Sequence, residues 1–172
     1  RMNRNKIIVF GSSVTGASHL DLGLPCQDFF DHAVLDSGLI VIAIADGLGS
    51  ASRSDQGSRA AVETVIRFFS QDERQGDLIN DFAAFSESAL RDSFLAAREA
   101  ITEKSRETGA PVNEFATTLL AVIACKNSLI AANLGDGAVV GMADGGMFMI
   151  SSPSPSGYEN EVMPLTNDDW ES

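Results

Sequence analysis

Three acidic residues stand where the chain is expected to turn sharply, and their chemistry points to a metal ion. Asp46 follows the apolar run 39–45 and precedes Gly47, while Asp28 and Asp136 lie at two further turns next to expected strands. A carboxylate at the end of a buried strand lies at the rim of the core, and Gly47 exposes its carbonyl oxygen beside it. Carboxylate and carbonyl oxygens are the ligands that Mg²⁺ and Mn²⁺ prefer. The pattern therefore favours a divalent-cation site around Asp46.

Two other interpretations of this turn stay open. An Asp-Gly pair is also typical of an ordinary turn. The stretch 47–49 has the Gly-x-Gly spacing of a dinucleotide-binding loop, but Ser52 stands where that motif has its third glycine. Asp46 would also bring a negative charge against a pyrophosphate, which argues against a dinucleotide.

The elements that must position these residues follow from hydrophobic periodicity. Residues 29–35 and 39–45 flank the turn signal Asp-Ser-Gly at 36–38 and are expected to form a hairpin. The second arm is continuously apolar, which predicts a central strand covered on both faces. Apolar residues at helical spacing predict helices over 54–69 and 77–108.

Further short strands are predicted before and after these helices. They cover residues 6–14, 116–125, 128–134, 138–143 and 147–150. Strands, then a pair of helices, then a meander of strands predicts an α+β fold with mainly antiparallel sheets. Asp144, followed by glycine, is interpreted as the hairpin turn between the last two strands.

The composition describes a folded chain with a strong negative charge. The sequence has 172 residues, 44% of them hydrophobic, which is enough for one domain with a sizeable core. Its net charge of −12 disfavours nucleic acids and anionic membranes as partners. No apolar run reaches the roughly 18 residues that span a bilayer. Cys26 and Cys125 lack the spacing of zinc or redox sites, so we expect two reduced thiols and a cytoplasmic protein.

Six segments, in consecutive order along the chain, carry a pattern that goes beyond any one turn. They are Gly-Ala-Ser-His (16–19), Pro-Cys-Gln-Asp (25–28), Ile-Ala-Asp-Gly-Leu-Gly-Ser-Ala (44–51) with Ser-Asp-Gln-Gly-Ser (54–58), Phe-Ala-Thr-Thr-Leu-Leu (115–120) and Asn-Leu-Gly-Asp-Gly (133–137). Together they resemble the type 2C protein phosphatases, the metal-dependent Ser/Thr phosphatase family, and most closely its bacterial signalling branch. The resemblance implies two packed, mainly antiparallel β-sheets flanked by pairs of helices.

The same resemblance implies roles for individual residues. Asp46 would bridge two Mg²⁺ or Mn²⁺ ions, and Gly47 would bind an ion through its carbonyl. Asp28 would hold metal-bound water, and Asp136 matches the position that helps to bind a third ion. In this family Asp28 and Asp46 would serve catalysis, because the ions activate a water that hydrolyses phosphoserine or phosphothreonine in a phosphoprotein substrate.

Two positions depart from the family pattern. Many members have Glu before the first Asp, where this chain has the neutral Gln27, and an Arg that grips phosphate, where this chain has Gly23. His19 lies nearby in the sequence and is a candidate phosphate-binding residue. A purely structural or surface histidine is an equally good interpretation of His19.

The family domain is longer than this chain and carries further Asp ligands on later motifs. We therefore interpret residues 1–172 as one phosphatase 2C-like domain that is incomplete at its C-terminal end, with 151–172 as a loop and acidic tail. Asp168 and Asp169 are interpreted as solvated charges of this tail.

Two functions stay open at this point. The chain is either a metal-dependent phosphatase or a piece of one, or it is a non-catalytic phosphatase-like module that binds a partner or a phosphopeptide. Because sheet edges left open favour pairing between chains, association with a second copy is also expected.

Overall fold

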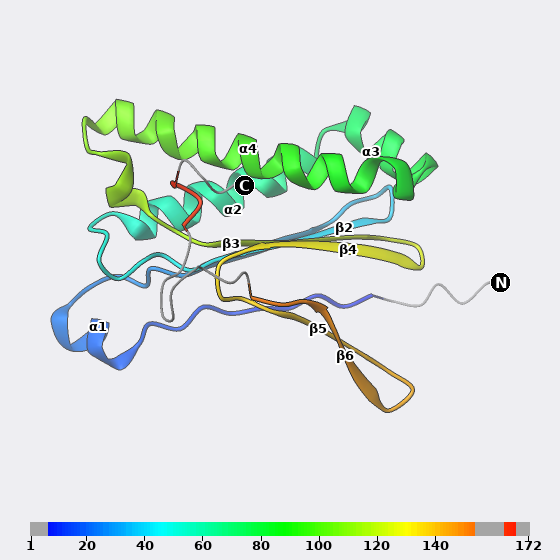
Figure 1. Cartoon of the computed structure of the whole chain (residues 1–172), viewed down its shortest axis with the longest axis horizontal. Helices are drawn as coiled ribbons and strands as arrows, with labels where there is room; N and C mark the ends of the chain where they lie inside the picture. Colours follow the sequence, from blue (N-terminus) through cyan, green and yellow to red (C-terminus); the bar gives the residue numbers. More distant parts are fainter. Residues whose placement is uncertain (1–6, 154–163, 168–172) are drawn as a thin grey trace.

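The computed structural model describes residues 7–153 and 164–167 and contains an antiparallel sheet covered by helices (Figure 1). Its elements are α1 (Ala17–Leu22), β1 (Phe29–Val34), β2 (Leu39–Ala45), α2 (Ser54–Phe69), α3 (Asp72–Asn80), α4 (Phe82–Thr108), the 3-10 helix η1 (Val112–Phe115), β3 (Leu119–Cys125), β4 (Ser128–Leu134), β5 (Val139–Ala143) and β6 (Gly146–Ser151). Strands β1 to β4 form one sheet in that order, and β5 pairs with β6 in a second sheet. This confirms the predicted α+β fold with antiparallel sheets.

Strand β2 lies at the centre of the four-stranded sheet, between β1 and β3. On one face its Leu39, Val41 and Ala43 are fully buried. On the opposite face Ile40 is 8% exposed, but Ile44 is 43% exposed. The sequence predicted a strand covered on both faces. That prediction is correct for the face under the helices and wrong at Ile44, where the second face is open.

Helices α2, α3 and α4 lie together on the covered side of this sheet, and the β5–β6 pair lies on the other side (Figure 1). The N-terminal part of α2 approaches η1 very closely. A Cβ atom added at Gly57 would lie 2.0 Å from the carbonyl oxygen of Phe115, so only glycine fits there. The predicted helix 54–69 is confirmed, and its first turn is fixed against the segment that leads into β3.

Two of the predicted elements are wrong in detail. Residues 7–14 form no strand, and Phe10 is 88% exposed, because the alternating pattern there has no hydrogen-bonded partner among the described residues. The predicted helix 77–108 is the end of α3 followed by α4. The helix is interrupted at Asp81. The Asp81 carboxylate accepts a hydrogen bond from the Ala84 N–H at 3.1 Å and so caps the N-terminus of α4.

The β5–β6 pair is a hairpin, as predicted, and Asp144 is part of its turn with a positive φ of 51°. The first residues, 1–6, and the predicted tail residues Asp168 and Asp169 lie outside the described residues. Of the helices in the described part, none combines the length and apolar character needed to cross a bilayer. Cys26 and Cys125 are free thiols, as predicted.

Candidate metal centre

The backbone of Asp46 makes three hydrogen bonds with Thr117 and Thr118, the two residues just before β3. The Asp46 N–H donates to Thr118 Oγ1 at 2.9 Å. The Asp46 carbonyl accepts from the Thr118 N–H at 2.8 Å and from Thr117 Oγ1 at 3.0 Å. Both threonines are buried. The backbone N–H and the backbone carbonyl of Asp46 are therefore both held, and the carboxylate projects from a fixed position.

Gly47 stands in a space that admits no side chain. A Cβ atom there would lie 2.7 Å from the Gln27 carbonyl oxygen and 2.8 Å from Ser54 Cβ. The Gln27 carbonyl accepts hydrogen bonds from the Gly47 N–H at 3.2 Å and from Ser58 Oγ at 2.6 Å. These contacts join the segment before β1 to the turn after β2, and they bring Asp28 next to Asp46.

A cleft of about 360 Å³ opens at this junction. The predicted residues that line it are His19, Asp28, Asp46 and Gly47. His19 reaches it from α1, a short helix that the sequence did not predict. Four of the five predicted site residues therefore meet in one cleft.

The fifth, Asp136, does not line the cleft, although its charge acts on Asp46. Partial burial raises the pKa of Asp46 from 3.8 to about 6, assisted by a hydrogen bond with Asp28 and by the charges of Asp28 and Asp136. The pKa of Asp46 is raised even though its carboxylate is open to the cleft. Asp136 lies in a turn where Asn133 Nδ2 donates to the Gly137 carbonyl. A bound cation would offset the repulsion between carboxylates that lie this close together.

Gln27 adds a second feature that points to a ligand. Its side chain is nine-tenths buried and lines the cleft, and Oε1 has no hydrogen-bond partner among the described residues. A buried acceptor left without a partner is costly, so this oxygen calls for a donor such as a water.

The donor set fits a hydrated hard cation. Within the described residues, no group of three or more His, Cys, Asp or Glu side chains is arranged to hold a metal ion. Mg²⁺, however, is commonly bound through only one or two carboxylates and keeps several waters. The carboxylates of Asp28 and Asp46, the Gly47 carbonyl and the unpaired oxygen of Gln27 therefore suit such an ion.

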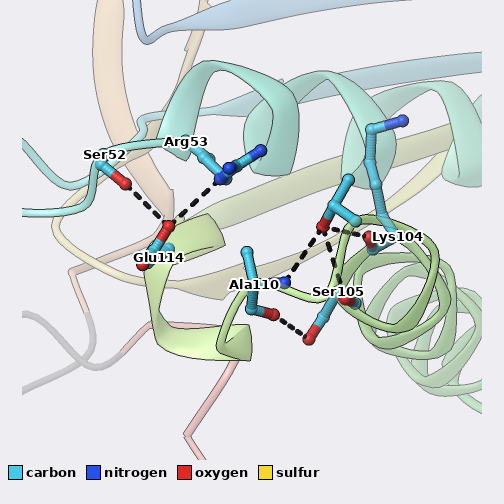
Figure 2. A network of polar contacts seen from close by, with 7 residues as sticks. Ser52, Arg53, Lys104, Ser105, Ala110 and Glu114 are labelled. Carbon is cyan, nitrogen blue, oxygen red and sulfur yellow. Dashed lines mark hydrogen bonds and ion pairs between the residues drawn. The ribbon is translucent and has the colours of Figure 1, made fainter.

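Sequence reasoning also missed an ion pair between Arg53 and Glu114, which lies outside the lining of the cleft. Figure 2 shows the Glu114 carboxylate reaching both Ser52 and Arg53. Glu114 Oε2 lies 3.1 Å from Arg53 Nε and accepts from Ser52 Oγ at 2.9 Å. The pair fastens the residues just before α2 to η1. Nothing in the sequence indicates it, because its partners are 61 residues apart. The sequence motif 115–120 contains Thr117 and Thr118 but does not indicate their hydrogen bonds to Asp46.

Known proteins with a similar sequence are phosphatases. The sequence model of the family described as protein phosphatase 2C matches residues 15–172. Serine/threonine-protein phosphatase 3 of Escherichia coli (strain K12) is 28% identical over 167 residues, which cover 94% of this chain and 63% of that protein.

Solved structures agree on the fold. The serine/threonine phosphatase Stp1 from Staphylococcus aureus superposes with a TM-score of 0.60 at 17% identity, over 74% of this chain and 47% of that one. The S. agalactiae serine/threonine phosphatase gives a TM-score of 0.53 at 25% identity, over 74% of this chain and 49% of that one. The chain thus spans about half the length of these solved structures.

Proposed function

Because the chain belongs to the protein phosphatase 2C family, we propose that it takes part in metal-dependent hydrolysis of phosphoserine and phosphothreonine in proteins. The observation that carries this proposal is the meeting of Asp28, Asp46 and the Gly47 carbonyl in one cleft whose charge calls for a cation. Mg²⁺ and Mn²⁺ are the ions that suit these oxygen donors, with two or three of them in a complete domain.

Each residue of the site has a proposed task. Asp46 holds the ions by its carboxylate and Gly47 by its carbonyl, while Asp28 and Gln27 accept hydrogen bonds from bound water. His19, half-buried in the same cleft, orients the phosphate. Asp136 adds negative charge from outside the cleft and helps to hold a third ion. The chemistry that the ions supply is the activation of a water for in-line attack on phosphorus.

Titration of Mn²⁺ by calorimetry tests the assignment of Asp46. We expect Asp46→Asn to weaken Mn²⁺ binding at least tenfold and to abolish any turnover of p-nitrophenyl phosphate, because the substitution removes the charge that the ion requires. Asp36→Asn, in the exposed turn of the β1–β2 hairpin, is the matched control and should bind Mn²⁺ like the wild type. Equal Mn²⁺ affinity of the Asp46 variant and the wild type would rule out the site.

One observation favours a second candidate function. The described residues offer only two carboxylates at the cleft, and Gln27, the residue before Asp28, is neutral. Such a site could bind a phosphopeptide without cleaving it. Binding of a phosphopeptide with no release of phosphate at millimolar Mn²⁺ would favour this non-catalytic module over the enzyme.

We also propose that two copies associate through the β5–β6 hairpin. One face of this hairpin carries Val140, Met142, Met147 and Met149, which are 55%, 78%, 80% and 58% exposed. An isolated two-stranded hairpin is marginally stable in water. Residues 138–151 contain a single charged side chain in a chain of net charge −12, so two copies can meet here with little repulsion.

Free thiols at both cysteines agree with a cytoplasmic location.

A further inference from the structure

A second cavity lies on the other side of the turn that forms the metal centre. Its volume is about 440 Å³, within the range of roughly 300–1,000 Å³ typical of ligand pockets. Along residues 47–50 the chain alternates between the two spaces. Gly47 and Gly49 line the acidic cleft, whereas Leu48 and Ser50 line the second cavity. The two spaces therefore share one wall, the backbone of residues 47–50.

The walls of the cavity are anchored to the same residues that hold the metal centre. The Leu48 N–H donates to the Ala116 carbonyl at 2.9 Å, and the Leu165 N–H donates to the Thr117 carbonyl at 2.8 Å. Leu165 is fully buried, so the turn 164–167 is pinned to the core beside Asp46. The cavity is thus preformed and fixed relative to the carboxylates.

Among the described residues, the lining is uncharged and rich in hydrogen-bonding groups. Leu48, Ala116 and Pro164 form its apolar part. Ser50, Asn113 and Thr166 contribute hydroxyl and amide groups, and within the described residues their side chains make no hydrogen bonds. Neutral donors and acceptors around an apolar floor suit the amide groups and small side chains of an extended peptide. These described lining residues offer no counter-charge to a charged side chain, whose burial would be costly.

We propose that this cavity binds the residues of the substrate polypeptide that flank the phosphorylated side chain, and that it favours small, uncharged ones. The inference rests on the proposed function of the neighbouring cleft, which would take the phosphate. It gives the chain a means to prefer phosphoproteins over small phosphate esters, since a small ester fills the cleft alone. Asn113 and Thr166 are then specificity-determining residues.

Binding measurements on the whole chain test this proposal without requiring turnover. The probe is a fluorescent peptide that carries a non-hydrolysable phosphonate analogue of phosphothreonine between alanines and serines, titrated in Mn²⁺ and followed by anisotropy. We expect Asn113→Ala and Thr166→Val each to weaken peptide binding about 3- to 10-fold, the value of one hydrogen bond. Affinity for inorganic phosphate, measured by calorimetry in Mn²⁺, should stay at the wild-type value.

Asn127→Ala, in the exposed turn between β3 and β4, is the control and should leave both affinities unchanged. A peptide with lysine or glutamate in place of the flanking residues should bind less tightly than the neutral peptide. Unchanged peptide affinity in both cavity variants, absence of peptide binding by the wild type, or an equal loss of phosphate affinity would overturn the proposal. Failure of the proposed function has a different signature, namely phosphate binding that depends on neither Mn²⁺ nor Asp46.

Discussion

The two faces of the central strand β2 are both apolar in sequence but differ in how they are covered. In β2, Leu39 and Val41 point toward the helices and are fully buried, whereas Ile44 on the other face is 43% exposed. Asp46 continues the alternation of Ile44 and emerges on this open side, where it can meet solvent and a ligand. Hydrophobicity alone therefore does not say which face is closed. The helices close one face, and the open end of the other face makes the carboxylates accessible.

We expect the largest difference in stability between the two faces for a matched pair of Leu→Ala substitutions. Leu119 is fully buried on the helix-covered face of β3, and Leu129 is 45% exposed on the other face of β4. We expect Leu119→Ala to lower the free energy of unfolding by about 2–5 kcal/mol through the cavity it leaves. Leu129→Ala should cost less than about 1 kcal/mol. Urea denaturation measures both, and similar costs would mean that the outer face is covered in solution.

A smaller effect is predicted where α2 meets η1 on the covered side. Gly57→Ala pushes a methyl group into the Phe115 carbonyl and should destabilise the fold by about 1–3 kcal/mol. Gly76→Ala, in α3, meets nothing within 4 Å and should stabilise the fold by about 0.5–1 kcal/mol through helix propensity. The two melting temperatures should move in opposite directions. A shift in the same direction would contradict the close packing at Gly57.

The acidic cleft on the open side predicts a dependence of stability on pH. Since the pKa of Asp46 is raised to about 6, its protonated form favours the folded state, and this stability is lost as the pH rises from about 4 through 6. In the metal-free chain, Asp46→Asn should therefore raise the melting temperature at pH 7.5, and the gain should shrink toward pH 4. A gain that is independent of pH would show that Asp46 is not the titrating group.

The smallest effect on stability is expected on the outer hairpin. Met142→Ser and Met147→Ser change side chains that are already 78% and 80% exposed, so the free energy of unfolding should move by no more than about 0.5 kcal/mol. The same changes should weaken self-association, which sedimentation velocity measures across protein concentrations. A wild type that remains monomeric at every concentration would contradict the proposed contact between copies.

Local patterns predicted most of the fold where the partner of a segment is close in sequence. The β1–β2 hairpin and α2 were predicted within one residue because a turn signal and helical spacing lie within the segments themselves. The prediction of a strand over 6–14 was wrong, because alternation of apolar and polar residues does not indicate whether a partner strand exists. The single helix predicted over 77–108 failed because the cap at Asp81 resembles an ordinary exposed acid.

The candidate site was predicted in its residue types but not in its support. Asp28, Asp46, Gly47 and His19 share a cleft, as a resemblance between motifs suggested. The burial of Gln27, with its unpaired oxygen, and the threonine hydrogen bonds to Asp46 depend on pairings between distant segments. No local sequence pattern indicates such pairings.

The hydrogen bond between Asp46 and Thr118 joins residues 72 positions apart, with α2, α3 and α4 in the loop between them. Closing so long a loop is entropically costly and slow, and it gains little until the helices have packed. The proposed ion site therefore cannot act as an early nucleus for folding. Its proposed ligands reach their places only when β3 docks against β2. The appearance of Mn²⁺ binding during refolding would then mark one of the last steps on the pathway.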